Sequence, residues 1–215
     1  MTDDAVRGDG LFPPAAYARE DESFDHGFYL LPRKVVHIDE DAIAALGRLY
    51  AEVLPAGGRL LDLMSSWRSH LPAGFRAAEV VGLGMNAEEM ADNPQLTSAI
   101  VHDVNLERRL PFGDGEFDGA MCAVSVQYLI HPVQVFHEVG RVLRPGAPFV
   151  VSFSNRCFPT KAVAVWLNTS DEQHLTLVRA YFDTARGFDD VKEEDRSPRG
   201  YGDPLYAVWA RAGRS

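Results

Sequence analysis

Residues 59–70 of the chain read Arg-Leu-Leu-Asp-Leu-Met-Ser-Ser-Trp-Arg-Ser-His. Three leucines surround a single acid, Asp62, and the apolar run then gives way to small polar residues. The pattern predicts a buried strand over 59–64 that delivers a carboxylate to its C-terminal end. In an open parallel sheet, ligands bind at that end of the strands. The function of the protein therefore depends on what this strand end holds.

Strands and helices alternate around this stretch. Asp39 is expected to cap a helix whose apolar residues recur at helical spacing up to Val53. Downstream we expect strands at 79–83, 100–103, 117–125 and 149–154, helices from about 87, from 132 to about 143, and over 161–167 and 172–184, and a hairpin of 188–196 with 205–210. This order predicts an α/β, Rossmann-like, doubly wound fold. Its seven-stranded sheet is mostly parallel and ends in an antiparallel hairpin.

Length and periodicity divide the chain into two parts. Its 215 residues predict one main domain, which we expect at 39–215. Residues 1–38 are expected to form an N-terminal arm. The first 22 or so lack periodicity and predict loose packing, whereas 23–38 is dense in aromatic, imidazole and guanidinium groups and is a candidate lid.

Charge and cysteine content exclude several functions. The formal net charge of −10 argues against a general nucleic-acid binder and against attraction to an anionic membrane. No apolar run approaches the roughly 20 residues that a membrane-spanning helix needs. Two cysteines without metal-ligand spacing, and scattered histidines, predict no metal and a reducing, cytoplasmic location. We expect a small-molecule substrate and a monomer or homodimer.

The most specific pattern lies further along. It consists of Leu110-Pro111-Phe112, Phe117-Asp118-Gly119-Ala120, His131-Pro132 and Glu-Val-Gly-Arg-Val-Leu-Arg-Pro-Gly at 138–146. This block resembles the signature of class I S-adenosylmethionine (SAM) dependent methyltransferases, in the subgroup that includes the menaquinone/ubiquinone C-methyltransferases. The resemblance covers about residues 40–215. It implies SAM as cofactor and methyl transfer to a small molecule.

The chain departs from that family in two places. The family usually has D-L-G-C-G-T-G after the first strand, and here Met64, Ser65 and Ser66 follow Asp62-Leu63, in a pattern that resembles a narrower DLMSSW branch. At the end of the second strand, Gly84 stands where the family has an acid that holds the ribose hydroxyls. Asn86 is open between two roles, a ribose contact and a helix cap paired with Glu89.

The resemblance implies a set of cofactor contacts. Asp62 would bind the amino group of the methionine part of SAM, Met85 would lie against adenine, and Asp103 would accept a hydrogen bond from the adenine amino group. The full set of expected cofactor-binding residues is Asp62, Met64, Ser65, Ser66, Gly84, Met85, Asn86, Asp103, Val104, Asn105, Ala123, Val124 and Ser125.

The residues that meet the acceptor are less defined. The candidates for a general base are His26, Tyr29, His37 and His131, each with an ordinary packed or solvated role as the alternative. The residues expected to face the substrate are Tyr29, Arg33, His37, Trp67, His70, Asn155 and Arg156. The two arginines suit a carboxylate or phosphate. The two departures also leave open a protein of this fold that binds a ligand or partner without transferring a methyl group.

Overall fold

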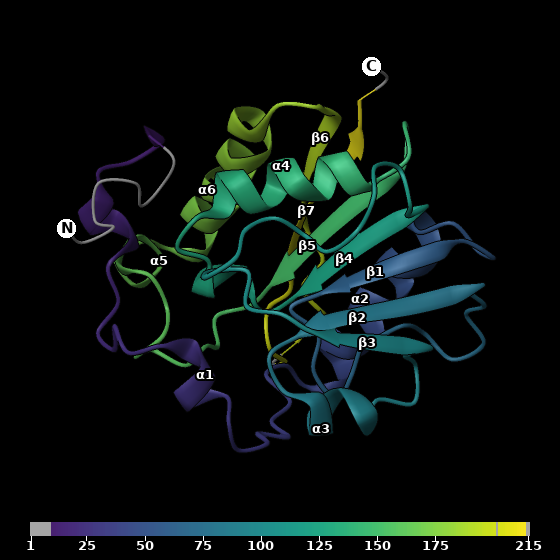
Figure 1. Cartoon of the computed structure of the whole chain (residues 1–215), viewed down its shortest axis with the longest axis horizontal. Coiled ribbons are helices and arrows are strands. Elements are labelled where there is room, and N and C mark those ends of the chain that lie inside the picture. The colour runs from purple at the N-terminus through teal and green to yellow at the C-terminus, as the bar shows by residue number, and fades with distance from the viewer. Residues whose placement is uncertain (1–9, 201, 214–215) are drawn as a thin grey trace.

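A seven-stranded mixed sheet with helices on both faces forms the centre of the computed structural model, which describes residues 10–200 and 202–213 (Figure 1). The strand order is β3-β2-β1-β4-β5-β7-β6. Strands β1 to β5 are parallel, and β7 runs antiparallel to both β5 and β6. The strands are β1 Arg59–Leu63, β2 Glu79–Gly84, β3 Ser98–Val101, β4 Gly119–Ala123, β5 Pro148–Phe153, β6 Phe188–Asp195 and β7 Tyr206–Ala212. The predicted sheet and its closing hairpin are confirmed.

Several element boundaries differ from the prediction. Strand β3 ends at Val101, so that Asp103 lies in the following loop, where its carboxylate accepts a hydrogen bond from the Asn105 amide at 2.9 Å. Strand β4 ends at Ala123 because Val124 turns the chain with a φ of 43°. The helices are α1 Asp25–Phe28, α2 Glu40–Val53, α3 Ala87–Ala91, α4 Pro132–Val142, α5 Ala164–Leu167 and α6 Asp171–Ala185. Helix α5 therefore begins after Lys161, which lies in a turn.

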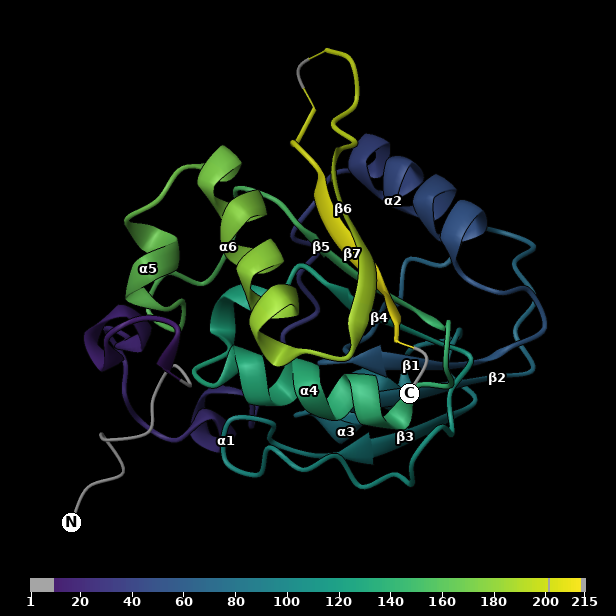
Figure 2. The same ribbon diagram turned by 90° about the horizontal axis from the view of Figure 1, so that it is seen from above.

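The alternation of side chains along the strands divides the core between the two faces. Leu60, on β1, is buried in a cluster with residues of α2, whereas its neighbour Leu61 is buried in a cluster with residues of α4 and α6. Figure 2 shows α4 and α6 together on one side of the sheet and α2 on the other. Each strand thus contributes to two separate cores.

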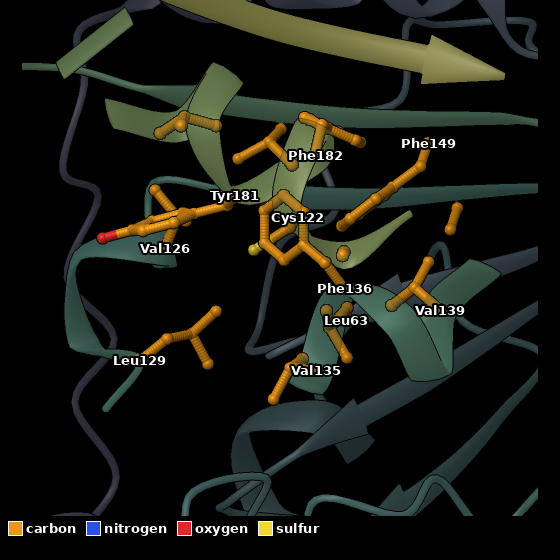
Figure 3. Close-up of a cluster of buried hydrophobic side chains, with 14 of the residues drawn as sticks. Leu63, Cys122, Val126, Leu129, Val135, Phe136, Val139, Phe149, Tyr181 and Phe182 are labelled. Carbon is orange, nitrogen blue, oxygen red and sulfur yellow. The ribbon is translucent and has the colours of Figure 1, made fainter. Parts of the chain in front are cut away.

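Aromatic rings dominate the core beneath α4 and α6. The ring of Phe136 lies 5.1 Å from that of Phe149 and 4.8 Å from that of Phe182, measured between centroids (Figure 3). Edge-to-face pairs of this kind add to the stabilisation from buried area. Cys122 is fully buried in the same cluster, and burial raises the pKa of its thiol to about 12, which suits an unreactive core residue.

Two of the crossover connections contain no helix. The segment between β1 and β2 and the segment between β3 and β4 are both irregular throughout their described length. The chain after β1 instead turns at Met64, and the Ser65 amide then donates a hydrogen bond to the Leu83 carbonyl on β2 at 2.9 Å. The first loop is therefore fastened across the end of the neighbouring strand.

This crossing explains why position 84 is a glycine. A Cβ atom added to Gly84 would lie 2.1 Å from the carbonyl oxygen of Ser65, which is a contact that no side chain can make. An acid at this strand end is sterically excluded by the path of the first loop. The two departures of the sequence from the family pattern are thus one coupled feature.

The described part of the N-terminal segment packs against the domain. Residues 1–9, which fall in the expected arm, lie outside the described residues. Tyr17, in the short 3-10 helix Pro14–Tyr17, is fully buried, and Leu11 and Phe12 pack against the same core cluster. The prediction of loose packing is therefore wrong for residues 10–22, because it was based on missing periodicity and overlooked three large apolar side chains. No helix in the described residues is long and apolar enough to cross a membrane.

Gly84→Ala should destabilise the protein by about 3 kcal/mol, because the new methyl group forces the first loop away from β2. Urea unfolding measures the effect. Gly27→Ala is the matched control, since a Cβ at Gly27 has nothing within 4 Å. Equal midpoints for the two variants would contradict the close crossing.

Candidate functional site

A cleft opens at the C-terminal ends of β1, β2 and β4 and is closed on its outer side by the N-terminal segment. Figure 1 shows this segment, in purple and dark blue, passing along one end of the sheet. The cleft contains about 1110 Å³ of space between atoms, part of it open to solvent.

The cleft brings together most of the residues singled out from the sequence. Every member of the predicted cofactor set lies on its wall, at or just after the ends of the four neighbouring strands β3, β2, β1 and β4. Of the predicted substrate residues, the wall includes Tyr29, Arg33, His37, Trp67 and His70. All of these predicted wall residues come from the first 125 positions of the chain.

Four predicted site residues lie outside the cleft. His26 is exposed on α1, and His131 is buried at the start of α4, directly before Pro132. Asn155 and Arg156 are exposed after β5, and that loop turns toward the closing hairpin, where Arg156 Nε bonds to Asp203 at 2.9 Å. The cleft therefore does not include these four predicted residues, and a place after β5 was not sufficient to aim Asn155 and Arg156 at its wall.

Other wall residues were not predicted. They are Asp25, Val35, Val36, Arg68, Leu83, Glu89, His102, Tyr128 and Phe158. Phe158 lies 33 residues after Ser125 and gave no sequence signal, although its ring is 4.7 Å from His37 and its amide donates to the Tyr128 hydroxyl at 2.8 Å. The sequence predicts Glu89 only as the capping partner of Asn86. Its burial in the cleft wall has no local sequence signal.

Asp62 is the most buried carboxylate of the cleft. The hydroxyl groups of Ser65 and Ser69 both donate to its Oδ2, each at 2.6 Å. Burial raises the pKa of Asp62 to about 6, and the two hydroxyls oppose that rise. In the part of the chain that the structure describes, Oδ1 accepts no hydrogen bond, so this oxygen is available to a donor in the cleft.

Three residues of the cleft hold left-handed backbone conformations without being glycine. Met64, His70 and Val124 have φ values of 58°, 59° and 43°. Met64 occupies the first glycine position of the family loop, so the chain keeps the turn there and bears the strain of a side chain. A β-branched residue such as Val124 is especially unfavourable in this region. Strain of this kind concentrates at functional sites.

Asn86 forms only half of the expected capping box. Its Oδ1 accepts from the Glu89 amide at 2.9 Å, but among the described residues the Glu89 carboxylate does not accept from the Asn86 backbone amide, and the Asn86 Nδ2 donates to the Tyr29 carbonyl at 2.8 Å. Glu89 instead accepts hydrogen bonds from the Ser66 hydroxyl and from the Arg33 amide. The start of α3 therefore fastens the N-terminal segment to the first loop.

A buried ionic network fixes the other end of that segment. Lys161 is fully buried, and its Nζ donates to the Ser23 carbonyl at 2.7 Å and lies 3.2 Å from Asp25. Asp25 also pairs with Arg19 at 2.8 Å and accepts from Asn105 at 3.0 Å. Buried charges need such partners, so this wall of the cleft depends on its tether.

Ionisable side chains near the cleft mouth are held neutral. Burial, reinforced by the charge of Arg68, lowers the pKa of His70 to about 4. Burial and Arg156 lower the pKa of His37. Burial raises the pKa of Tyr29, so its phenol stays protonated. Neutral imidazoles can accept a proton, whereas a neutral phenol donates a hydrogen bond. Among residues 10–200 and 202–213, no group of three or more acids, histidines or cysteines is placed to hold a metal ion.

The comparisons with known proteins agree with this geometry. Residues 67–151 match a family model described as a methyltransferase domain, and the match begins directly after the altered loop positions. The chain is 36% identical over 85 residues to methyltransferase phqN of Penicillium fellutanum, which spans 37% of this chain and 26% of that protein. It is 27% identical over 175 residues to an uncharacterized methyltransferase of Mycobacterium sp. (strain JLS), which spans 80% of this chain and 65% of that protein.

The fold matches solved structures of the same kind. One is a SAM dependent methyltransferase from Aquifex aeolicus, with a TM-score of 0.55, 17% identity, and coverage of 80% of this chain and 91% of that chain. The sheet order and closing hairpin are therefore those of class I methyltransferases. Residues 67–151 thus match a methyltransferase domain within a chain that has this fold, and the chain spans less than two thirds of the curated relatives' length.

Asp62→Asn should gain stability relative to the wild type as pH rises from about 4 to about 7. The folded-state pKa of Asp62, about 6, lies above its ordinary 3.8, so the folded protein binds this proton more tightly than the unfolded chain does. The penalty for the buried charge is fully present above the folded pKa and disappears below the unfolded one. We expect the difference in unfolding free energy to change by about 3 kcal/mol across this range in urea titrations. A pH-independent difference would contradict a buried charge, and Asp183→Asn, at an exposed acid of α6, is the control.

Lys161→Met should loosen the N-terminal wall. The variant keeps the length of the side chain but leaves Asp21 and Asp25 without its ammonium group, which lies 3.1 and 3.2 Å from them. Hydrogen exchange at residues 21–29 should accelerate, with a loss of about 3–5 kcal/mol in stability. Lys192→Met, at an exposed lysine of β6, is the control. Unchanged exchange at 21–29 would refute the tether.

Proposed function

We propose that this protein transfers the methyl group of SAM to a small-molecule acceptor. The observation that carries the proposal is the convergence of four strand ends on one cleft, with one carboxylate, Asp62, on β1 and another, Asp103, just after β3. The methyltransferase domain match supports it. We further infer a place near the menaquinone/ubiquinone C-methyltransferase-like subgroup, in a branch whose first loop is rebuilt with serines.

The donor set of the cleft suits this cofactor. Asp62 has both hydroxyl bonds on Oδ2, and Asp103 has the amide bonds from Asn105 and Leu106 on Oδ1. In the described residues each carboxylate thus keeps one oxygen without a hydrogen bond. Asp62 would accept from the amino group of the methionine part, and Asp103 from the amino group of adenine. A charge-assisted bond of this kind contributes about 1.5–3 kcal/mol.

The protein's part in the reaction is to orient the acceptor and exclude water. When bound, the cofactor supplies an activated methyl group on its sulfonium. Residues 23–38 wall the cleft on the acceptor side, and we propose that they set specificity. The aromatic contacts of Phe158 with His37 and Phe28, at 4.7 and 5.5 Å, keep that wall apolar. Orientation alone can lower a barrier by roughly 7–11 kcal/mol.

A proton acceptor is available if the acceptor molecule must lose a proton. Of the four candidates from the sequence, His37 and Tyr29 line the cleft. Tyr29 stays protonated because burial raises its pKa, so it can donate but not accept. His37 is neutral at pH 7, since burial lowers its pKa, and we assign it as the general base. His26 and His131 are not part of this proposal.

One observation favours a second candidate, a methyltransferase-fold protein that binds a ligand without transferring a methyl group. Residues 64–70 contain no glycine, and no helix lies between them and β2. Two of their serines, Ser65 and Ser69, already donate hydrogen bonds to Asp62. Fold alone does not fix function. Conversion of SAM to S-adenosylhomocysteine in the presence of a metabolite extract would dismiss this candidate.

Asp103→Ala should weaken binding of S-adenosylhomocysteine about 10-fold or more, because the adenine amino group loses its acceptor. Isothermal calorimetry measures the affinity. Asp183→Ala, on α6 and remote from the cleft, is the control and should bind like the wild type. No heat with the wild type at millimolar SAM or S-adenosylhomocysteine would refute the function, and equal affinities of all three proteins would refute the role of Asp103.

A further inference from the structure

The strand end that faces the middle of the cleft has no acceptor for sugar hydroxyls. Gly84 ends β2, and the Ser65 carbonyl occupies the space that a side chain there would need. Any ligand that carries a nucleoside past this point must find its acceptor elsewhere. The same wall continues through Met85 and Asn86 into α3.

Asn86 is not that acceptor, because its amide group is already used at both ends. Its Oδ1 accepts from the Glu89 amide, and its Nδ2 donates to the Tyr29 carbonyl. Turning the side chain toward a ligand would uncap α3 and release the N-terminal segment. A buried donor or acceptor that loses its partner costs about 1–3 kcal/mol.

Glu89 has the properties that Asn86 lacks. It is 5% exposed and lies on the cleft wall one turn into α3. Each carboxylate oxygen accepts one hydrogen bond within the protein, Oε1 from the Arg33 amide and Oε2 from the Ser66 hydroxyl. A carboxylate has about four acceptor sites, so both oxygens can accept once more.

Glu89 also forms no direct ion pair with a basic side chain of the described residues. Among the described residues no lysine, arginine or histidine pairs with it, whereas Asp25, the other buried acid of this wall, pairs with both Arg19 and Lys161. Buried carboxylates are stabilised by charged partners or by several hydrogen-bond donors. Two donors are present in the protein, and the carboxylate lies on the wall of the cleft, where a ligand could supply more.

We propose that Glu89 accepts hydrogen bonds from the vicinal 2′- and 3′-hydroxyls of a nucleoside, with one hydroxyl on each carboxylate oxygen. This inference rests on the proposed function, in which the nucleoside is the adenosine of SAM. Ser66 and the Arg33 backbone hold the carboxylate in place from the first loop and the N-terminal segment. Glu89 on α3 thereby supplies the hydroxyl acceptor that the end of β2 cannot supply, because a side chain at position 84 is excluded.

The test is a calorimetric cycle with two ligands, S-adenosylhomocysteine and its 2′,3′-dideoxy analogue, on the full chain. The wild type should bind S-adenosylhomocysteine about 10- to 100-fold more tightly than the analogue. Glu89→Gln should lose most of that preference while its affinity for the analogue changes less than about 2-fold. Glu89→Asp keeps the charge but shortens the side chain by one methylene group, and it should also lose the preference for S-adenosylhomocysteine. This second variant guards against a folding defect in the first.

Glu88→Gln is the matched control, because it makes the same change at the exposed neighbouring acid of α3, which is not on the cleft wall. It should keep the preference for the diol. If both Glu89 variants keep the wild-type preference, or weaken both ligands equally, Glu89 does not bind the hydroxyls even though the cofactor binds. A wild type that binds neither ligand overturns the proposed function and this inference together.

Discussion

The carbonyl group of Ser65 lies where a side chain at position 84 would have to be, and the rest of the cleft depends on this crossing. It fastens the first loop to β2, removes the space for an acid at the strand end, and brings three serine hydroxyls inward. Ser65 and Ser69 reach Asp62, and Ser66 reaches Glu89. A loop without glycines is therefore not a degraded version of a glycine-rich one. It is a different loop structure, in which side-chain hydroxyls donate hydrogen bonds to the buried carboxylates of Asp62 and Glu89.

The N-terminal segment forms the outer wall of the cleft. It is joined to the domain by several polar contacts, among them those of the Asn86 and Glu89 side chains near Tyr29 and Arg33, and those of the buried Lys161 near Asp25. Polar tethers specify a position more strictly than apolar contacts do, because a small displacement leaves buried groups unsatisfied. The wall that would meet an acceptor is thus held in register with the strand ends.

The fold and the strand-end part of the cleft could be predicted from the sequence, since both rest on local patterns. Alternating apolar runs place Asp62 and Asp103 at or just after strand ends, and topology alone brings strand ends together. Phe158, Glu89 and Asp25 could not be found in this way, because their roles come from tertiary contacts with distant segments. The position of Arg156 also depends on a distant segment. The loop after β5 turns toward the closing hairpin, where Arg156 pairs with Asp203.

The tether at Lys161 also has a consequence for the order in which the protein is made. Its contact with Ser23 joins residues 138 positions apart. Ribosomes add about 5–20 residues per second, so the N-terminal segment waits for seconds before its anchor exists. All five parallel strands are synthesised in that interval. A nascent chain that stops before Lys161 can hold the N-terminal segment at Asn86 and Glu89 but not at Asp25, so the complete tether belongs only to the longer chain.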